Sequence, residues 1–197
     1  MGETKTRIPL ADAERLAAEV VELLRPACER IEIAGSIRRG KPDVGDIEIL
    51  AVPTIEQGHD MFGEPNCAYV NRLDLLCSQL LGIGTFTARL DVNGRASFGS
   101  KYKRLNYWGS GGGFPLDLFS VIEPAQWGVL YLIRTGPADF SHRFVTSKTA
   151  GGMLPPWAQV ADGAIRHRGT GEVYATPEEA DVFRLIGVDY IEPEGRT

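Results

Sequence analysis

Two acidic residues on one short predicted strand constrain this chain more than any other feature. Asp46 and Glu48 flank Ile47 at the start of the apolar segment Asp46–Val52. Because side chains alternate between the two faces of a strand, both carboxylates point to the same side. Carboxylate oxygens are the ligands that Mg²⁺ prefers in proteins. The pattern therefore indicates a strand with a divalent-cation site at its start.

The residues before this acidic pair can bind an anion. A second predicted strand, Arg30–Ala34, ends at a turn that contains Gly35 and Ser36. That turn offers backbone N–H groups and a hydroxyl, and Arg38 and Arg39 add guanidinium donors. An acidic pair or an arginine pair alone is more often part of a solvated surface. Together they favour a cation that bridges a triphosphate.

Length and composition exclude several classes of protein. The 197 residues, 43% hydrophobic and 24% charged, can bury the core of one domain or of two small ones. No apolar stretch is long enough to span a bilayer, and the first residues lack the apolar run of a signal peptide. Cys28, Cys67 and Cys77 show no paired metal-ligand spacing. We therefore expect a cytoplasmic protein without a membrane partner.

The charge balance limits how the chain can meet nucleic acid. A net charge of −5 argues against a protein that coats nucleic acid electrostatically. The net charge is negative, but Lys101, Lys103 and Arg104 form a local basic cluster. Contact with nucleic acid is therefore expected to be local, weak and sensitive to salt.

Hydrophobic periodicity predicts an α+β fold in two parts. Helices are expected over 10–30, 69–81 and 125–132, with a loop over 55–66, and strands over 85–90, 96–98, 104–108 and 114–122. After Arg134 the chain contains more glycine, proline and charge, with short helices expected over 139–148 and 177–185. We expect a first domain over 1–134, with a mixed sheet and two packed helices, and a small α+β lobe over 135–197.

A third carboxylate lies on one of the later predicted strands. Asp117 stands between Leu116 and Leu118. A carboxylate buried among apolar neighbours is costly unless it is paired with a cation or bound to a metal. Asp117 is thus either a third metal ligand or a salt-bridged aspartate of the core.

These motifs resemble the palm of family X DNA polymerases, the DNA polymerase β-like group of the nucleotidyltransferase superfamily. The resemblance lies in the order and spacing of six segments: 35–40, 45–48, 116–118, 128–130, 135–136 and 183–196. It implies a nucleotidyltransferase palm over 1–134 and a thumb-like lobe over 135–197, which is a minimal palm-plus-thumb form.

The resemblance also implies roles for individual residues. Asp46, Glu48 and Asp117 would be catalytic and would hold two Mg²⁺ ions, for which Mn²⁺ can substitute. The residues that bind the nucleotide would be Gly35, Ser36, Arg38, Arg39, Gly45, Thr135 and Gly136. Lys101, Lys103 and Arg104 would contact nucleic acid.

The chain departs from the family pattern at several places, two of which lie at or beside the expected site residues. Glu48 stands where the family usually has aspartate, and Ile133-Arg134 replaces an aromatic pair. The expected activity is Mg²⁺-dependent transfer of a nucleotide from a nucleoside triphosphate to the 3′-hydroxyl of a DNA primer or primer–template, by a monomer that holds DNA weakly. Alternatives are a non-DNA acceptor (RNA, a small molecule or a protein) and a catalytically silent module that binds nucleotide or DNA.

Overall fold

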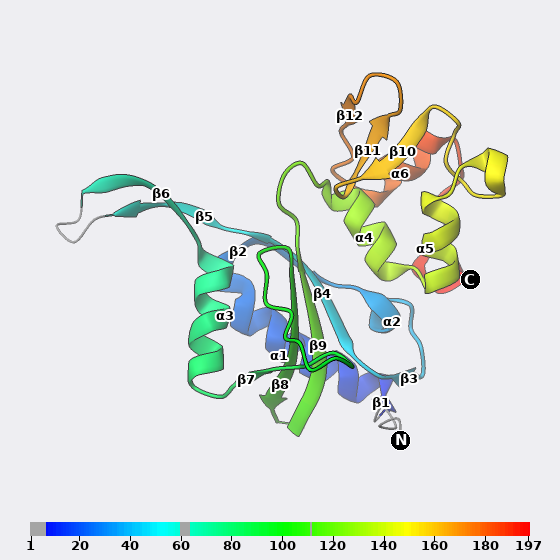
Figure 1. Cartoon of the computed structure of the whole chain (residues 1–197). Coiled ribbons are helices and arrows are strands. Elements are labelled where there is room, and N and C mark those ends of the chain that lie inside the picture. The colour runs from blue at the N-terminus through cyan, green and yellow to red at the C-terminus, as the bar shows by residue number, and fades with distance from the viewer. Residues whose placement is uncertain (1–6, 60–63, 111) are drawn as a thin grey trace.

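A five-stranded mixed sheet forms the centre of the first part of the chain (Figure 1). The computed structural model describes residues 7–59, 64–110 and 112–197, without the side chains of 59 and 65–67. Strand β9 runs parallel to β4, and the other neighbours are antiparallel. The order across the sheet is β2 (Cys28–Ile33), β4 (Ile47–Pro53), β9 (Gly112–Ser120), β8 (Tyr102–Gly109) and β7 (Phe86–Ala88). The expected α+β class with a mixed sheet is confirmed.

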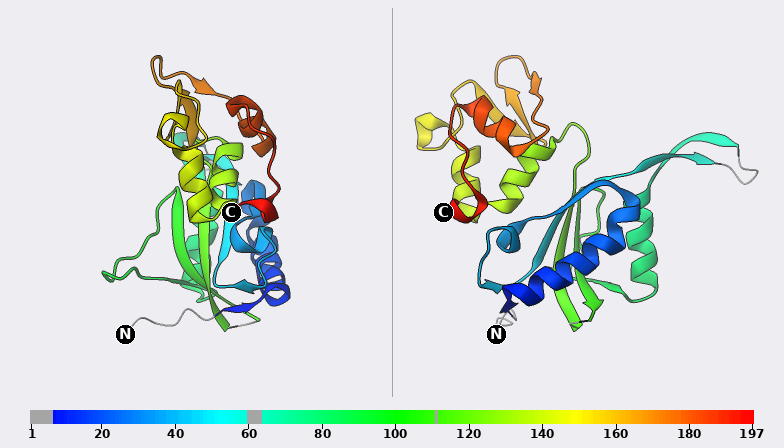
Figure 2. Two further views of the ribbon diagram at one scale, coloured as in Figure 1. Left: turned by 90° about the vertical axis from the view of Figure 1, so that its right-hand side faces the viewer. Right: turned by 180° about the vertical axis from the view of Figure 1, so that it is seen from behind.

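Two helices, α1 (Leu10–Leu24) and α3 (Arg72–Gly82), cover one face of this sheet. In the right-hand view of Figure 2, seen from behind, α1 lies in front of the strands. Helix α1 is shorter than expected because Pro26 lies in a 3₁₀ turn, η1 (Arg25–Ala27), after which the chain enters β2. Helix α3 starts later than expected because the Asn71 side chain accepts a hydrogen bond from the Asp74 N–H at 3.0 Å and caps the first turn.

The prediction of a loop over 55–66 is wrong for most of this segment. Strands β5 (Ile55–His59) and β6 (Pro65–Asn71) pair as a hairpin that projects from the body of the molecule (Figure 1). Residues 60–63 lie outside the described chain. The polar, glycine-containing sequence has low strand propensity, but cross-strand pairing outweighs this local preference.

The turn expected at Asn93-Gly94 is confirmed, but the strand expected over 96–98 is not, since Ala96 and Phe98 form only isolated bridges. Gly94 has φ +74°, and the Asp91 carboxylate accepts hydrogen bonds from the backbone N–H groups of Asn93 and Arg95. Leu90 and Ala96 form an isolated antiparallel bridge below this turn. This hairpin joins the edge strand β7 to β8.

The C-terminal part has its own sheet and core. Strands β10 (Ala158–Ala161), β11 (Ala164–His167) and β12 (Val173–Tyr174) form an antiparallel sheet beside helices α5 (Ala138–Val145) and α6 (Glu179–Ile186). Helix α4 (Trp127–Thr135) contacts both parts, since Val129 packs in this second core and Trp127 packs with Leu50 and Phe119 of the first sheet. The division at 134/135 therefore falls inside α4 and stays a prediction.

Short elements complete the described chain. Strands β1 (Ile8–Pro9) and β3 (Asp43–Val44) pair beside the short helix α2 (Gly35–Arg38), and the 3₁₀ turns η2 (Lys148–Ala150) and η3 (Pro193–Gly195) lie in the C-terminal part. Of the helices in the described ranges, none is both long and apolar enough to cross a membrane.

Candidate active site

Three strands bring the predicted carboxylates to one face of the sheet. Glu48 of β4 is paired in register with Asp117 of β9, which is paired with Arg104 of β8. Asp46 lies immediately before β4, two residues from Glu48. Ile47, the residue between them, is fully buried in the core on the other face. The carboxylates thus lie on the face opposite α1 and α3, which is the open face of the sheet.

Glu48 fills the space beside the glycine turn. Gly35 has φ +64°, and a Cβ atom there would lie 2.8 Å from Cδ of Glu48 and closer still to its Oε2. A glycine is therefore needed at position 35 for two reasons: the left-handed backbone and the approach of the Glu48 carboxylate.

The Glu48 carboxyl holds its proton more strongly than a glutamate in water. Its pKa is raised to about 7, first by burial and then by the charges of Asp46 and Asp117, against the opposing effect of Arg39 and Arg134. Two negative charges that raise the pKa of a neighbouring carboxyl in this way favour a cation beside it. The oxygen chemistry of the three side chains fits Mg²⁺.

The side chains are not arranged as a preformed metal site. Within the described ranges, no group of three Asp, Glu, His or Cys side chains lies close enough to hold a metal ion. Glu48 turns toward Gly35, and Asp117 is held by other residues. Glu48 would have to turn away from Gly35 before it could share an ion with Asp46 and Asp117, and the Mg²⁺ sites stay a prediction.

Asp117 is bound to Tyr102 of β8 and to Arg89, which directly follows β7. One oxygen, Oδ1, accepts hydrogen bonds from Nη2 of Arg89 at 2.6 Å and from the Tyr102 hydroxyl at 2.7 Å. The side chains of Arg89 and Asp117 are each only 14% exposed. Asp117 is therefore salt-bridged, as the alternative interpretation of the sequence expected, and its Oδ2 is the oxygen that these bonds leave for another ligand. The sequence did not identify Arg89, because it reaches Asp117 only through the pairing that places it opposite Arg104.

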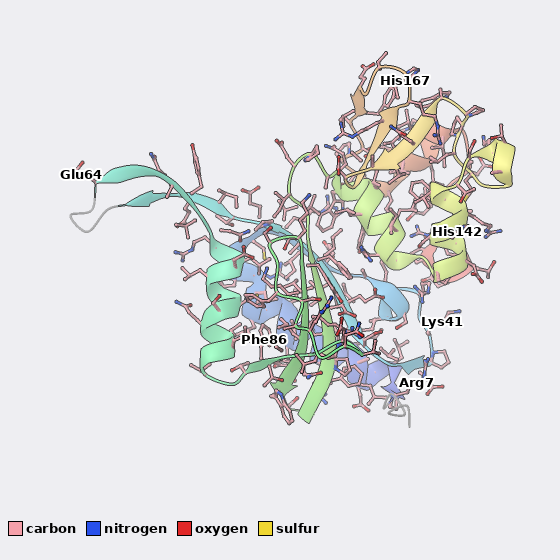
Figure 3. The ribbon with its side chains drawn as sticks, viewed as in Figure 1. Arg7, Lys41, Glu64, Phe86, His142 and His167 are labelled. Carbon is pink, nitrogen blue, oxygen red and sulfur yellow. The ribbon has the colours of Figure 1, made fainter. Side chains whose placement is uncertain are left out.

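An open cavity of about 480 Å³ lies beside Asp46 and Glu48. Gly45, Ser36 and Arg39, three of the residues expected to bind nucleotide, line it, and the buried Ser36 hydroxyl has no hydrogen-bond partner. Arg7, which the sequence did not identify, and Lys41 add positive charge at the edge near β1 and β3 (Figure 3). A cavity with three cationic side chains beside carboxylates can hold a polyphosphate with its metal.

Arg38 points away from this cavity and joins the two parts of the chain. Its guanidinium makes paired hydrogen bonds to Glu179 of α6, at 2.8 and 2.6 Å, and a third to Oγ1 of Thr135 at 2.7 Å. Buried Arg196 also donates to Glu179, at 2.8 Å. Arg38 is thus committed to a buried ion-pair network, which argues against its expected role in binding nucleotide.

Thr135 and Gly136 have structural roles in this arrangement. Thr135 is buried, and its carbonyl accepts a hydrogen bond from Arg39. At Gly136 a Cβ atom would lie 2.6 Å from Cδ1 of Phe140, so the glycine allows α5 to pack against the end of α4. Neither residue lines the cavity beside Asp46.

Arg134, which replaces an aromatic residue of the family pattern, faces the carboxylates. Its guanidinium carbon lies 3.9 Å from the centre of the Phe119 ring, and its Nε is buried without a hydrogen-bond partner. Burial lowers the pKa of Arg134, while the charges of Glu48 and Asp117 oppose this shift. The side chain is placed to contribute positive charge to a substrate on the open face.

The three predicted nucleic-acid contacts separate in the structure. Lys101 is exposed, and Arg104 lies in the row with Asp117 and Glu48. Lys103 points to the opposite face, where it is fully buried and forms an ion pair with Asp74 of α3. This burial argues against Lys103 as a nucleic-acid contact. The physical reason is the alternation of side chains along β8.

Comparisons with known proteins agree with this site at a coarse level. No protein-family model matches the chain. The chain is similar to DNA polymerase lambda of Rattus norvegicus, with 26% identity over 195 aligned positions. The alignment covers 91% of this chain but only 32% of that polymerase. The chain is thus a distant partial homologue of a DNA polymerase, which suggests a nucleotidyltransferase-like function.

Proposed function

We propose that this chain is a Mg²⁺-dependent nucleotidyltransferase of the family X type, which adds a nucleotide to the 3′-hydroxyl of a DNA strand. The observation that carries the proposal is that Asp46, Glu48 and Asp117 share one open face with a cationic cavity. The similarity to DNA polymerase lambda across most of this chain supports it.

The cavity would hold the triphosphate of the incoming nucleotide. The Ser36 hydroxyl would donate to a phosphate oxygen, which would satisfy a group that is buried without a partner. Arg39, Lys41 and Arg7 would neutralise the remaining phosphate charge. Such preorganised donors act most strongly on charge that develops at the leaving pyrophosphate.

The reaction would be an in-line displacement at the α-phosphorus. A bond forms from the acceptor 3′-oxygen to this phosphorus, the bond from phosphorus to the bridging oxygen breaks, and pyrophosphate leaves with that electron pair. The hydroxyl proton passes to solvent water. Asp46, Glu48 and Asp117 would hold the Mg²⁺ ions, which when bound lower the pKa of the attacking hydroxyl and neutralise phosphate charge.

The domain division, the monomeric state and the weak binding of DNA form part of the same proposal. The segment 1–134 would act as the palm and 135–197 as the thumb, in a monomer whose two parts are joined by the ion pair of Arg38 with Glu179. A net charge of −5 supports weak binding of DNA.

The test is extension of a labelled primer–template by the purified protein with Mg²⁺ and each nucleoside triphosphate. Asp46→Asn should lower the rate by about 100-fold or more, the range for loss of a major electrostatic contact in a transition state. The matched control is Asp12→Asn, because Asp12 is an exposed carboxylate on α1. The proposal fails if wild type extends no primer, or if Asp46→Asn extends it as fast as wild type. Parallel reactions with RNA, small-molecule and protein acceptors test the alternatives.

A further inference from the structure

Trp108 is the large aromatic side chain that the open face of the sheet leaves exposed. It lies on β8 four residues beyond Arg104, so the two side chains point to the same face. The indole is 55% exposed to solvent. Tryptophan side chains are usually largely buried, so an exposed one on the same face as the carboxylates is unusual.

The indole is fixed flat against the sheet by its neighbours. Its Nε1–H donates to Oγ1 of Thr87 on β7 at 2.9 Å. On the other side, the ring crosses Gly113 of β9, where a Cβ atom would lie 2.7 to 2.9 Å from three ring carbons. Glycine at 113 therefore makes room for the ring, and the hydrogen bond orients it. One face of the indole packs on the sheet, and the other faces solvent.

Basic side chains link this ring to the carboxylates. Arg104 lies between Trp108 and Tyr102 on the same face of β8, and Arg89 is next to it on the continuation of β7. Arg134 reaches the same face from α4. Positive charge between an exposed aromatic surface and the carboxylates matches the two needs of a single nucleic-acid strand, which are phosphate neutralisation and base stacking.

We infer that Trp108 is a stacking platform for a base of the acceptor strand, upstream of its 3′-end. The inference rests on the proposed function, because it takes the 3′-hydroxyl to lie at Asp117. Four strand residues separate Trp108 from the row of Arg104 and Asp117, which is about 13 Å at roughly 3.3 Å per residue. A stacked strand rises about 3.4 Å per nucleotide, so the platform meets a base about four nucleotides from the reacting end.

The spacing makes the inference testable through strand length. Fluorescence anisotropy at low salt would measure the affinity of labelled single-stranded DNA for wild type and for Trp108→Ala. For strands of about ten nucleotides the variant should bind roughly 5- to 150-fold more weakly, the range for loss of one base–aromatic stack. For strands of about three nucleotides, which end before the platform, the two proteins should bind equally.

Three further variants separate stacking from other effects. Trp108→Phe keeps a ring and should retain most of the affinity for long strands. Gly113→Ala should displace the indole and weaken the binding of long strands in the same way. Tyr69→Ala removes an aromatic side chain that is 77% exposed on β6, outside the open face, and should change nothing.

The outcomes distinguish this inference from the proposed function. If Trp108→Ala binds strands of every length as wild type does, or loses affinity equally for short and long strands, the stacking platform is refuted even when wild type extends primers. If Trp108→Ala instead abolishes self-association in sedimentation without changing DNA affinity, the face binds protein and the inference is overturned. If wild type shows the length-dependent loss but extends no primer, the platform stands and the proposed function fails.

Discussion

The contact between Gly35 and Glu48 yields the most quantitative prediction. Replacing Gly35 with alanine has two costs that the structure separates. A left-handed backbone at φ +64° costs an alanine about 1–2 kcal/mol. The new Cβ would also overlap the Glu48 carboxylate, with 2.8 Å to Cδ, and displacing a buried side chain costs about 1–3 kcal/mol.

A matched glycine isolates the first cost. Gly40 also has φ +64°, but a Cβ there would meet no atom within 4 Å. Gly40→Ala should therefore lose about 1–2 kcal/mol of unfolding free energy, and Gly35→Ala about 2–5 kcal/mol. Urea unfolding followed by circular dichroism measures both differences.

Shortening Glu48 isolates the second cost. In a Glu48→Asp background the Cδ and Oε2 atoms are no longer beside position 35, so Gly35→Ala should lose the backbone cost and only the small part of the overlap that Cβ of residue 48 causes at 3.0 Å. The double-mutant cycle should thus give a coupling of about 1–3 kcal/mol. Equal costs for Gly35→Ala and Gly40→Ala in the wild-type background, or no coupling in the cycle, would refute the reasoning.

Three other variants test the assignments of individual side chains. Burial favours the neutral form of Glu179, but hydrogen bonds from Arg38 and Arg196 outweigh this effect and lower its pKa. The Glu179 carboxylate therefore stabilises the fold above its unfolded pKa of about 4.3, and this stabilisation is lost as the pH falls below that value. Glu179→Gln should therefore lower the urea midpoint at pH 7, and the difference from wild type should shrink with acid; a difference independent of pH would contradict this. Lys103→Met should leave the affinity for DNA unchanged and lower the free energy of unfolding by about 1–3 kcal/mol, because the ion pair with Asp74 is lost. A fall in DNA affinity with intact folding would instead show that Lys103 contacts DNA. Arg89→Ala should lower kcat for primer extension by about 10- to 100-fold without raising KM for the nucleotide, because it frees Asp117 to turn, and an unchanged kcat would show that Tyr102 alone holds the carboxylate.

Local patterns were enough to predict the positions of the main strands and of the carboxylates. The alternation at Asp46 and Glu48 sets their common face whatever the partner strand is. The glycine at 35 and the hairpin at Asn93-Gly94 are likewise local, since both depend on backbone conformations that few residues adopt. The hairpin of β5 and β6 was missed because its pairing, and not its composition, makes it a strand pair.

The sequence by itself determined which chemical groups this protein has and which of them lie on one strand face, because a strand repeats every two residues. Only the tertiary structure decided which face each group meets. Arg38 and Arg39 are neighbours, yet one binds Glu179 in the C-terminal part and the other lines the cavity beside Asp46. Lys103 enters the core while Arg104 joins the row of carboxylates. Register between distant strands and the docking of α6 make these choices, and neither is encoded in the spacing of nearby residues.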